Sequence, residues 1–276
     1  MKKIFLLLLL IPFCILAQTK RFHYNLAFVP NEKQEDKIYH EKMILDIEEK
    51  RNLFYSQEYA RVDSINETNR NDKIFAYPKF SKVVKWEKKE GNFEFFNKLS
   101  IMYYVYPVEN TLQWELLSEK KVIGEFTVQK AICMYGGRKW IAWFTTELPL
   151  PYGPYVFYGL PGLVLEVYDE NKHYVFSLFK SEIIKKEDRD TLDMFISKGY
   201  FGVKRMNIKQ KDWKKILYNY YQDPIPEYKS GEEAMMTKND GTPYTAEDYR
   251  NLEKNIRTSM KNNNNPIELD QKVSYE

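Results

Sequence analysis

The chain has 276 residues, and its 42 basic and 39 acidic residues leave a formal net charge of +3 at neutral pH. This near-neutral balance argues against a nucleic acid as the natural partner. Aromatic residues make up 16% of the chain, with 22 Tyr and 17 Phe, and these side chains favour strands because they cover pleated, half-buried surfaces. The composition therefore predicts a mainly β protein with minor α structure.

Residues 1–17 have the pattern of a secretory signal peptide. Lys2 and Lys3 form a short basic start, residues 4–16 an apolar stretch, and Ala17 a plausible cleavage position. The apolar stretch is too short to span a bilayer comfortably. We expect an exported protein, periplasmic or extracellular and potentially associated with the outer membrane, with no transmembrane segment after cleavage.

The two cysteines carry different expectations. Cys14 lies inside the signal peptide, but Phe13 stands where a lipoprotein signal has a small residue, so we expect export without lipid attachment. Cys133 then remains alone, which excludes an intramolecular disulfide. It lies in a strand-like run with no His nearby in sequence, which favours a buried structural thiol over a nucleophile.

Period-two alternation predicts consecutive strands in the first half of the chain. In the first of them Phe22, Tyr24, Leu26 and Phe28 share one face. The segments with strand character are 22–28, 43–47, 53–56, 74–77, 81–86, 93–96 and 101–106. Residues 57–73 are polar and lack apolar periodicity, which indicates a long exposed loop that contains some helix at most.

The middle of the chain predicts a hairpin. Residues 122–135 and 138–145 are both rich in apolar and β-branched side chains, and the dipeptide Gly136-Gly137 between them suits a tight turn. We expect antiparallel pairing of these two segments.

A segment rich in proline and glycine follows the hairpin. It contains Gly159, Leu160, Pro161, Gly162 and Leu163. Pro161 and Gly162 suit the second and third positions of a type II turn, in which Gly162 would take a positive φ. The alternation then predicts a strand over 163–167 and a returning strand over 174–179. The glycines could instead let a backbone approach a ligand closely, but no phosphate-loop motif follows them.

Two short amphipathic helices are predicted near the end of the chain. Trp213, Ile216, Leu217 and Tyr220 follow helical spacing, and a second stripe begins after the potential cap Thr245. We therefore divide the chain into a signal peptide (1–17), an antiparallel β core (18–185) and a C-terminal extension (186–276) whose helices pack on the same domain. The expected architecture is a curved antiparallel sheet, either a half-barrel or an open sandwich.

Arg138, Trp140 and Trp143 form the candidate ligand-binding set. In a strand Arg138 and Trp140 share a face while Trp143 points the other way. Arg beside Trp can bind an anion, a sugar ring or a peptide terminus. The alternative is that Arg138 simply packs across Trp140 at the end of the hairpin.

No catalytic, metal or cofactor motif is evident. The histidines at 23, 40 and 173 are widely separated, and neither H-E-x-x-H nor G-x-S-x-G occurs. Glu147, Glu166 and Asp169 flank the proline- and glycine-rich segment and could pair as glycosidases require, or could be ordinary solvated or hydrogen-bonded carboxylates. We predict no cofactor, no metal site and no catalytic residue.

Two motifs resemble the GLPGLI family of secreted Bacteroidetes proteins. They are Gly159-Leu-Pro-Gly-Leu-Val164 and Gly137-Arg-Lys-Trp-Ile-Ala-Trp143, and the resemblance covers about residues 20–185. The family has no settled biochemical role, so the resemblance implies an exported envelope protein only. We favour a non-enzymatic binding or carrier protein for an apolar or peptide ligand. The alternatives are an envelope hydrolase or peptidase-associated enzyme, and a structural protein that contacts other envelope proteins.

Overall fold

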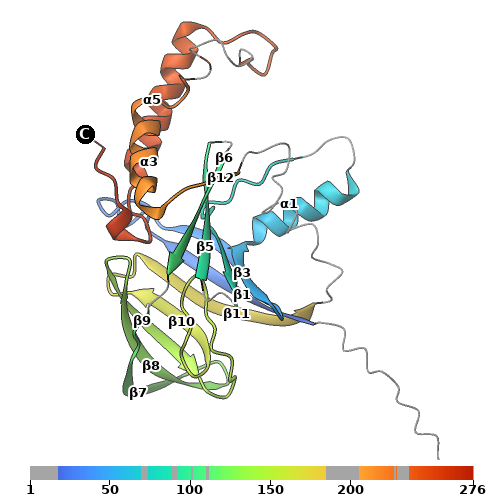
Figure 1. The fold of residues 1–276 in the computed structure, drawn as a ribbon, viewed down its shortest axis with the longest axis vertical. Helices are drawn as coiled ribbons and strands as arrows, with labels where there is room; N and C mark the ends of the chain where they lie inside the picture. Colours follow the sequence, from blue (N-terminus) through green and yellow to red (C-terminus); the bar gives the residue numbers. More distant parts are fainter. Residues whose placement is uncertain are drawn as a thin grey trace, which may run out of the picture.

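The computed structural model describes residues 18–69, 74–88, 92–100, 102–109, 112–184, 205–226, 228 and 236–275. The predicted signal peptide lies outside these residues. Within them the fold is mainly β, with one open sheet of 12 strands and with helices toward the C-terminus (Figure 1). This confirms the predicted fold class. The pairing is antiparallel throughout except at one edge, where a short strand pairs in parallel, so the sheet is mixed.

The strands form two groups along the chain. The first group is β1 (Thr19–Phe28), β2 (Tyr39–Ile47), β3 (Arg51–Ser56), β4 (Val83–Glu87), β5 (Asn92–Leu99) and β6 (Met102–Glu109). The second group is β7 (Glu115–Ile123), β8 (Phe126–Tyr135), β9 (Arg138–Thr145), β10 (Leu163–Asp169) and β11 (Tyr174–Ile184). The short strand β12 (Arg205–Asn207) pairs in parallel with β6 at the sheet edge.

Each group is a meander of neighbouring hairpins, and the two meet at the middle of the sheet. The strand order is β12-β6-β5-β4-β3-β2-β1-β11-β10-β9-β8-β7. The joint is the antiparallel pair β1–β11, which runs from Thr19 opposite Ile184 to Phe28 opposite Tyr174. The side chains of β1 that were predicted to share a face are all buried.

The predicted hairpin at Gly136-Gly137 is confirmed, with one correction. β8 and β9 pair antiparallel from Gln129 opposite Phe144 to Tyr135 opposite Arg138. The run 122–135 is not a single strand, however. Gly124 has a φ of +60° and forms a turn that places Val122 in the preceding strand β7.

The segment 57–73, expected to be an exposed loop with some helix at most, contains a regular helix of 12 residues, α1 (Gln57–Thr68). Ser56 caps it by accepting a hydrogen bond from the Glu58 amide at 3.0 Å. Tyr59 and Val62 alone carry its apolar face into the core, too few to give a periodic signal.

Residues 74–77, predicted to be a strand, do not belong to the sheet. Instead the backbone N–H and C=O of Ile74 are both bound by the Asn66 side chain, at 2.9 Å each. These side-chain bonds replace ladder bonds that strand pairing would have supplied.

The two predicted C-terminal helices are confirmed. The first is α3 (Trp213–Gln222), preceded by the 3₁₀ turn η4 (Gln210–Asp212); the second is α5 (Ala246–Asn262), and a 3₁₀ turn η5 (Leu269–Gln271) follows it. Thr245 and Asp248 form a reciprocal capping box at the start of α5. None of the helices in the described part of the chain is long and apolar enough to cross a membrane.

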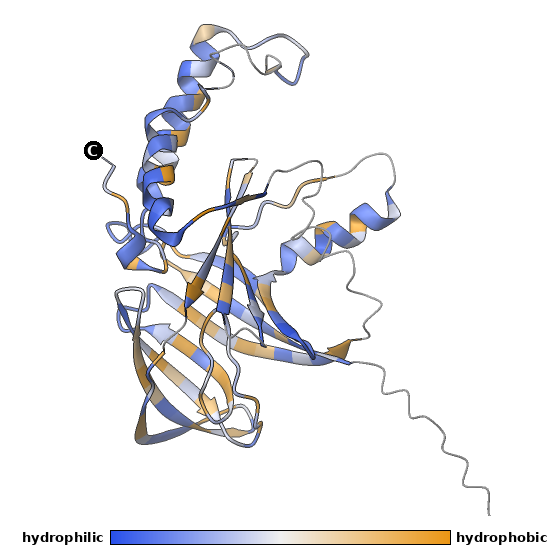
Figure 2. Ribbon diagram, in the orientation of Figure 1, coloured by the Kyte–Doolittle hydropathy of each residue, from blue (hydrophilic) through white to orange (hydrophobic). Residues whose placement is uncertain are grey.

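The two C-terminal helices, α3 and α5, differ in how they attach to the rest of the protein. Trp213 of α3 packs against Tyr104 and Tyr106 of β6. α5 has no buried residue and contacts α3, where Arg257 donates to the carbonyls of Tyr221 and Gln222. Figure 2 shows α5 as largely hydrophilic and projecting away from the sheet.

Candidate functional site

The loop between β9 and β10 fills the concave side of the curved sheet. Backbone hydrogen bonds at 3.0 Å from Gly159 to Pro151, from Leu163 to Leu148 and from Val164 to Tyr152 fold it into a compact unit. Its side chains Tyr155, Val156, Phe157 and Leu160 are buried in the main core, where Phe157 contacts Trp140 and Phe176. The interior of the sheet is therefore occupied by the protein's own chain.

Gly162 is required here for a reason other than the expected type II turn. Its φ is not positive, which contradicts that prediction. A Cβ at this position would instead overlap the carbonyl group of Thr145 at the end of β9. The left-handed glycine of this segment is Gly159, with a φ of +92° and open space around the position of a Cβ. A Cβ on Gly153 would likewise overlap the Phe157 carbonyl oxygen, so the loop needs glycine for close packing at Gly153 and Gly162 and for backbone conformation at Gly159.

Tyr155 lies at the centre of this loop in a strained conformation. Its φ is +58°, which costs a non-glycine residue on the order of 1 kcal/mol or more. The ring is buried against Phe54, Phe80 and Phe95. Its hydroxyl donates to the carboxylate of Glu268, which belongs to the C-terminal segment. The left-handed backbone at Tyr155 thus places its hydroxyl against the buried carboxylate of Glu268.

Glu268 is the centre of a polar cluster within the core. Its side chain is 3% exposed and accepts from Lys82 and Tyr155 and, at 3.5 Å, from Tyr135. Burial, and next the negative charge of Glu268, raise the pKa values of both tyrosines well above 10, so both phenols stay protonated at neutral pH. The carboxylate is therefore surrounded by donors.

Arg138 is buried and holds the same C-terminal segment. Its side chain is 2% exposed, and one nitrogen contacts Asp169 at 2.9 Å. The remaining donors bind the Asn265 side chain at 2.6 Å and the carbonyls of Pro266 and Ile267 at 2.8 and 3.0 Å. The guanidinium thus binds peptide groups, but those of its own chain.

The structure does not bring the other two candidate residues to Arg138. Trp140 is fully buried in the core and donates from its indole nitrogen to the Tyr135 carbonyl at 3.1 Å. Trp143 is nearly buried, with the Lys121 ammonium 4.3 Å from its ring centre. Contact of Arg138 with a foreign ligand would require the C-terminal segment to leave.

Asn265 is a second residue that anchors the C-terminal segment. Its amide nitrogen and Nδ2 donate to Pro30 and Val29, at 3.1 and 2.7 Å. Its carbonyl accepts from the Tyr174 hydroxyl at 2.6 Å, and its Oδ1 accepts from Arg138. All four polar groups are satisfied at a residue 2% exposed, so this asparagine fixes the C-terminal segment to the sheet.

Gly136 and Gly137 serve this docking as well as the hairpin turn. Both have positive φ values, +58° and +76°. A Cβ on Gly136 would lie 3.0 Å from the Glu268 backbone, and one on Gly137 would lie 3.3 Å from the Asp270 nitrogen. Glycine here lets the C-terminal segment lie directly on the turn.

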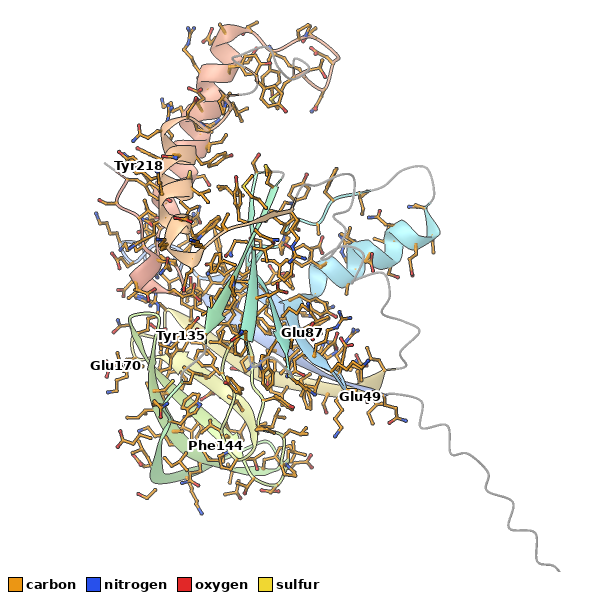
Figure 3. All side chains as sticks on the ribbon, in the orientation of Figure 1. Glu49, Glu87, Tyr135, Phe144, Glu170 and Tyr218 are labelled. Carbon is orange, nitrogen blue, oxygen red and sulfur yellow. The ribbon has the colours of Figure 1, made fainter. Side chains whose placement is uncertain are left out.

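An acidic cleft opens where the segment crosses the hairpin. It has a volume of about 260 Å³, and Tyr135, labelled in Figure 3, forms part of its wall. Three carboxylates line it, those of Glu109, Glu268 and Asp270, and no Lys or Arg is among its lining residues. Apolar side chains complete the wall, namely Val108, Leu112 and Met134.

The carboxylates considered for a catalytic pair are bound to separate partners. Glu147 accepts from the Thr127 amide at 2.9 Å, Glu166 from Lys121 at 2.8 Å, and Asp169 from Arg138. Within the described part of the chain, no three His, Cys, Asp or Glu side chains gather as a metal site would require. Burial raises the pKa of the Cys133 thiol to about 12, so this group holds little thiolate at neutral pH.

These features define a β protein with an open mixed sheet, an interior filled by its own loop and a C-terminal segment docked across a hairpin. A family model described as a protein of unknown function (Porph_ging) matches residues 137–166, which comprise β9, the loop between β9 and β10 and the first part of β10. No curated protein matches the chain significantly.

Two solved structures resemble the fold, both of PNGF-II, in C2 and P21 space groups. Each is 18% identical to the chain with a TM-score of 0.48. The match covers 72% of this chain and 32% or 33% of theirs, so the chain spans about a third of the length of these structures.

Proposed function

We propose that the protein is an exported, non-enzymatic envelope protein of the GLPGLI type that binds peptides through a basic side chain. The observation that supports this proposal is the acidic cleft, in which carboxylates stand beside an apolar wall. Lys and Arg combine an apolar stem with a charged head, so they match such a surface: the stem covers the apolar wall and the head reaches the acids.

The charge distribution in the cleft favours a cationic ligand. Glu268 is buried and bound by Lys82 and Tyr155, whereas Glu109 and Asp270 are exposed at the rim. The rim carboxylates are therefore the groups that meet an incoming cation, and Glu268 shapes the floor. A peptide is favoured over an apolar chain because the concave side of the sheet is already filled by the loop between β9 and β10.

One observation favours the hydrolase alternative. Glu268 and Tyr135 both line the cleft and lie within 3.5 Å of each other, as two cooperating polar groups would. Against it, both oxygens of Glu268 accept hydrogen bonds from the chain's own donors, and both neighbouring phenols stay protonated. We therefore assign the carboxylate to docking of the C-terminal segment.

Binding is tested with a pooled library of random hexapeptides and mass spectrometry of the retained fraction. We expect enrichment of peptides that contain Lys or Arg, and binding that weakens as salt is raised. Asp270→Asn and Glu109→Gln should each weaken binding on the order of three- to tenfold, since each removes one partly exposed charge.

The matched control is Glu49→Gln, which makes the same charge change in the turn between β2 and β3 (Figure 3). Its affinity should equal that of the wild type. Equal loss in all three variants would mean a long-range charge effect, and a retained fraction without basic residues would refute the proposed cleft ligand. Cleaved peptides among the products would support the hydrolase alternative instead.

Export is tested by the intact mass of protein recovered from the bacterial envelope. Cleavage after Ala17 should leave Gln18 as the first residue. A mass that retains residues 1–17, or that carries a diacylglyceryl group on Cys14, would contradict the proposal.

A further inference from the structure

A second pocket lies on the other side of Tyr155, lined mostly by aromatic rings. β3, β4 and β5 form one wall, and the loop between β9 and β10 forms the other. Trp86 is its central ring, with centroids 4.8 Å from Tyr158, 5.7 Å from Tyr152 and 5.8 Å from Phe93. Trp86, Tyr152 and Tyr158 are only partly buried, so the pocket reaches the surface.

Two residues that line this pocket each carry a buried polar atom without a hydrogen-bond partner. The atoms are Oδ1 of Asn52, an acceptor on a residue 5% exposed, and Nε1 of Trp86, a donor. Asn52 and Trp86 are opposite each other in the register of β3 and β4, so their side chains lie side by side on one face. Leaving such atoms unpaired is costly, and because the two residues are neighbours across the strands, one small group placed between them would serve both the acceptor and the donor.

The size of the pocket limits what that partner can be. Its free volume of about 20 Å³ holds about one water-sized oxygen. A hydroxyl group fits, and one hydroxyl can donate to Asn52 and accept from Trp86 at the same time. A carboxamide would also offer both functions, but it is too large for this space.

We propose that this pocket is a binding site for a neutral sugar, which inserts one ring hydroxyl between Asn52 and Trp86. The rest of the ring lies against the partly exposed aromatic faces of Trp86, Tyr152 and Tyr158. Aromatic surface with a few placed polar groups is the usual make-up of small-molecule sites. A serine side chain offers the hydroxyl but leaves those rings uncovered, so a sugar is favoured over a peptide. This site is independent of the acidic cleft, because the two share no lining residue.

The test uses saturation-transfer NMR on the full exported chain, with the methyl pyranosides of glucose, galactose, mannose and N-acetylglucosamine as probes. We expect at least one of them to bind with its ring protons saturated. Trp86→Phe keeps an aromatic ring but removes the donor, and Asn52→Leu removes the acceptor. Each should weaken binding on the order of three- to tenfold. Both variants should fold, because Nε1 of Trp86 and Oδ1 of Asn52 have no partner to lose and Asn52→Leu gives up only the contact of its amide with the partly exposed Tyr152.

Trp213→Phe is the matched control, since it makes the same chemical change in α3, and its sugar affinity should equal that of the wild type. Three outcomes would overturn the proposal. The first is binding of none of the pyranosides together with a single ordered water between Asn52 and Trp86 in a crystal structure. The second is unchanged affinity in both folded pocket variants, and the third is saturation transfer to a serine hexapeptide in place of the sugars.

Discussion

Replacing Arg138 with methionine should lower the free energy of unfolding by about 3–5 kcal/mol, because it leaves the buried carboxylate of Asp169 without its counter-ion. The same change removes every hydrogen bond that the guanidinium makes to the C-terminal segment. Arg138→Lys should recover only part of this loss, because one ammonium cannot reproduce a planar fork that reaches four partners. Urea denaturation measures the stability, and hydrogen exchange of residues 264–273 measures the docking.

Arg257→Met is the matched control for this prediction. Arg257 also donates to two backbone carbonyls, but at a partly exposed position on α5. Arg257→Met should lower the free energy of unfolding by about 1 kcal/mol or less. If Arg138→Met were no more destabilising than Arg257→Met, or left the C-terminal amides fully protected, the segment would be held by other contacts.

Gly162→Ala should destabilise the protein by about 3 kcal/mol, the upper part of the range for forced overpacking. The added Cβ would overlap the Thr145 carbonyl, and neither backbone can move without disturbing β9 or β10. Thermal and urea denaturation of the purified variant measure the effect.

Gly159→Ala separates this mechanism from backbone strain. Gly159 has the positive φ but open space around it, so alanine should cost only about 1 kcal/mol there. The reverse order of the two effects would mean that a left-handed turn, and not close packing at Thr145, is the main reason for glycine in this segment.

Strand positions were largely predictable because alternation is a local signal. The buried face of β1 and the hairpin at Gly136-Gly137 follow from it directly. α1 was not predictable, since only Tyr59 and Val62 mark its buried face and its cap, Ser56, ends the preceding strand. Hydrophobic periodicity reveals a helix or strand only when several of its apolar side chains lie on the same face.

The acidic cleft was not predictable from the sequence, because its carboxylates Glu109, Glu268 and Asp270 are brought together only by the fold. Arg138 was predicted to bind a ligand, whereas in the structure its guanidinium binds Asn265, Pro266 and Ile267 of its own chain. The spacing of residues in the sequence gives no sign that positions 138 and 265 are in contact. An asparagine run followed by Pro-Ile was the available signal, since apolar residues after a polar helix end need a place to be buried.

The central position of β1 governs the order in which the chain can assemble. The first strand made by the ribosome finds one neighbour, β2, at once, but its other neighbour, β11, is synthesised only about 150 residues later, and such distant pairing slows folding. Each meander can form from its own hairpins, but until β11 arrives the outer edge of β1 stays open and able to pair with other chains. Pairing of β1 with β11 is therefore the late step that joins the two meanders into one sheet.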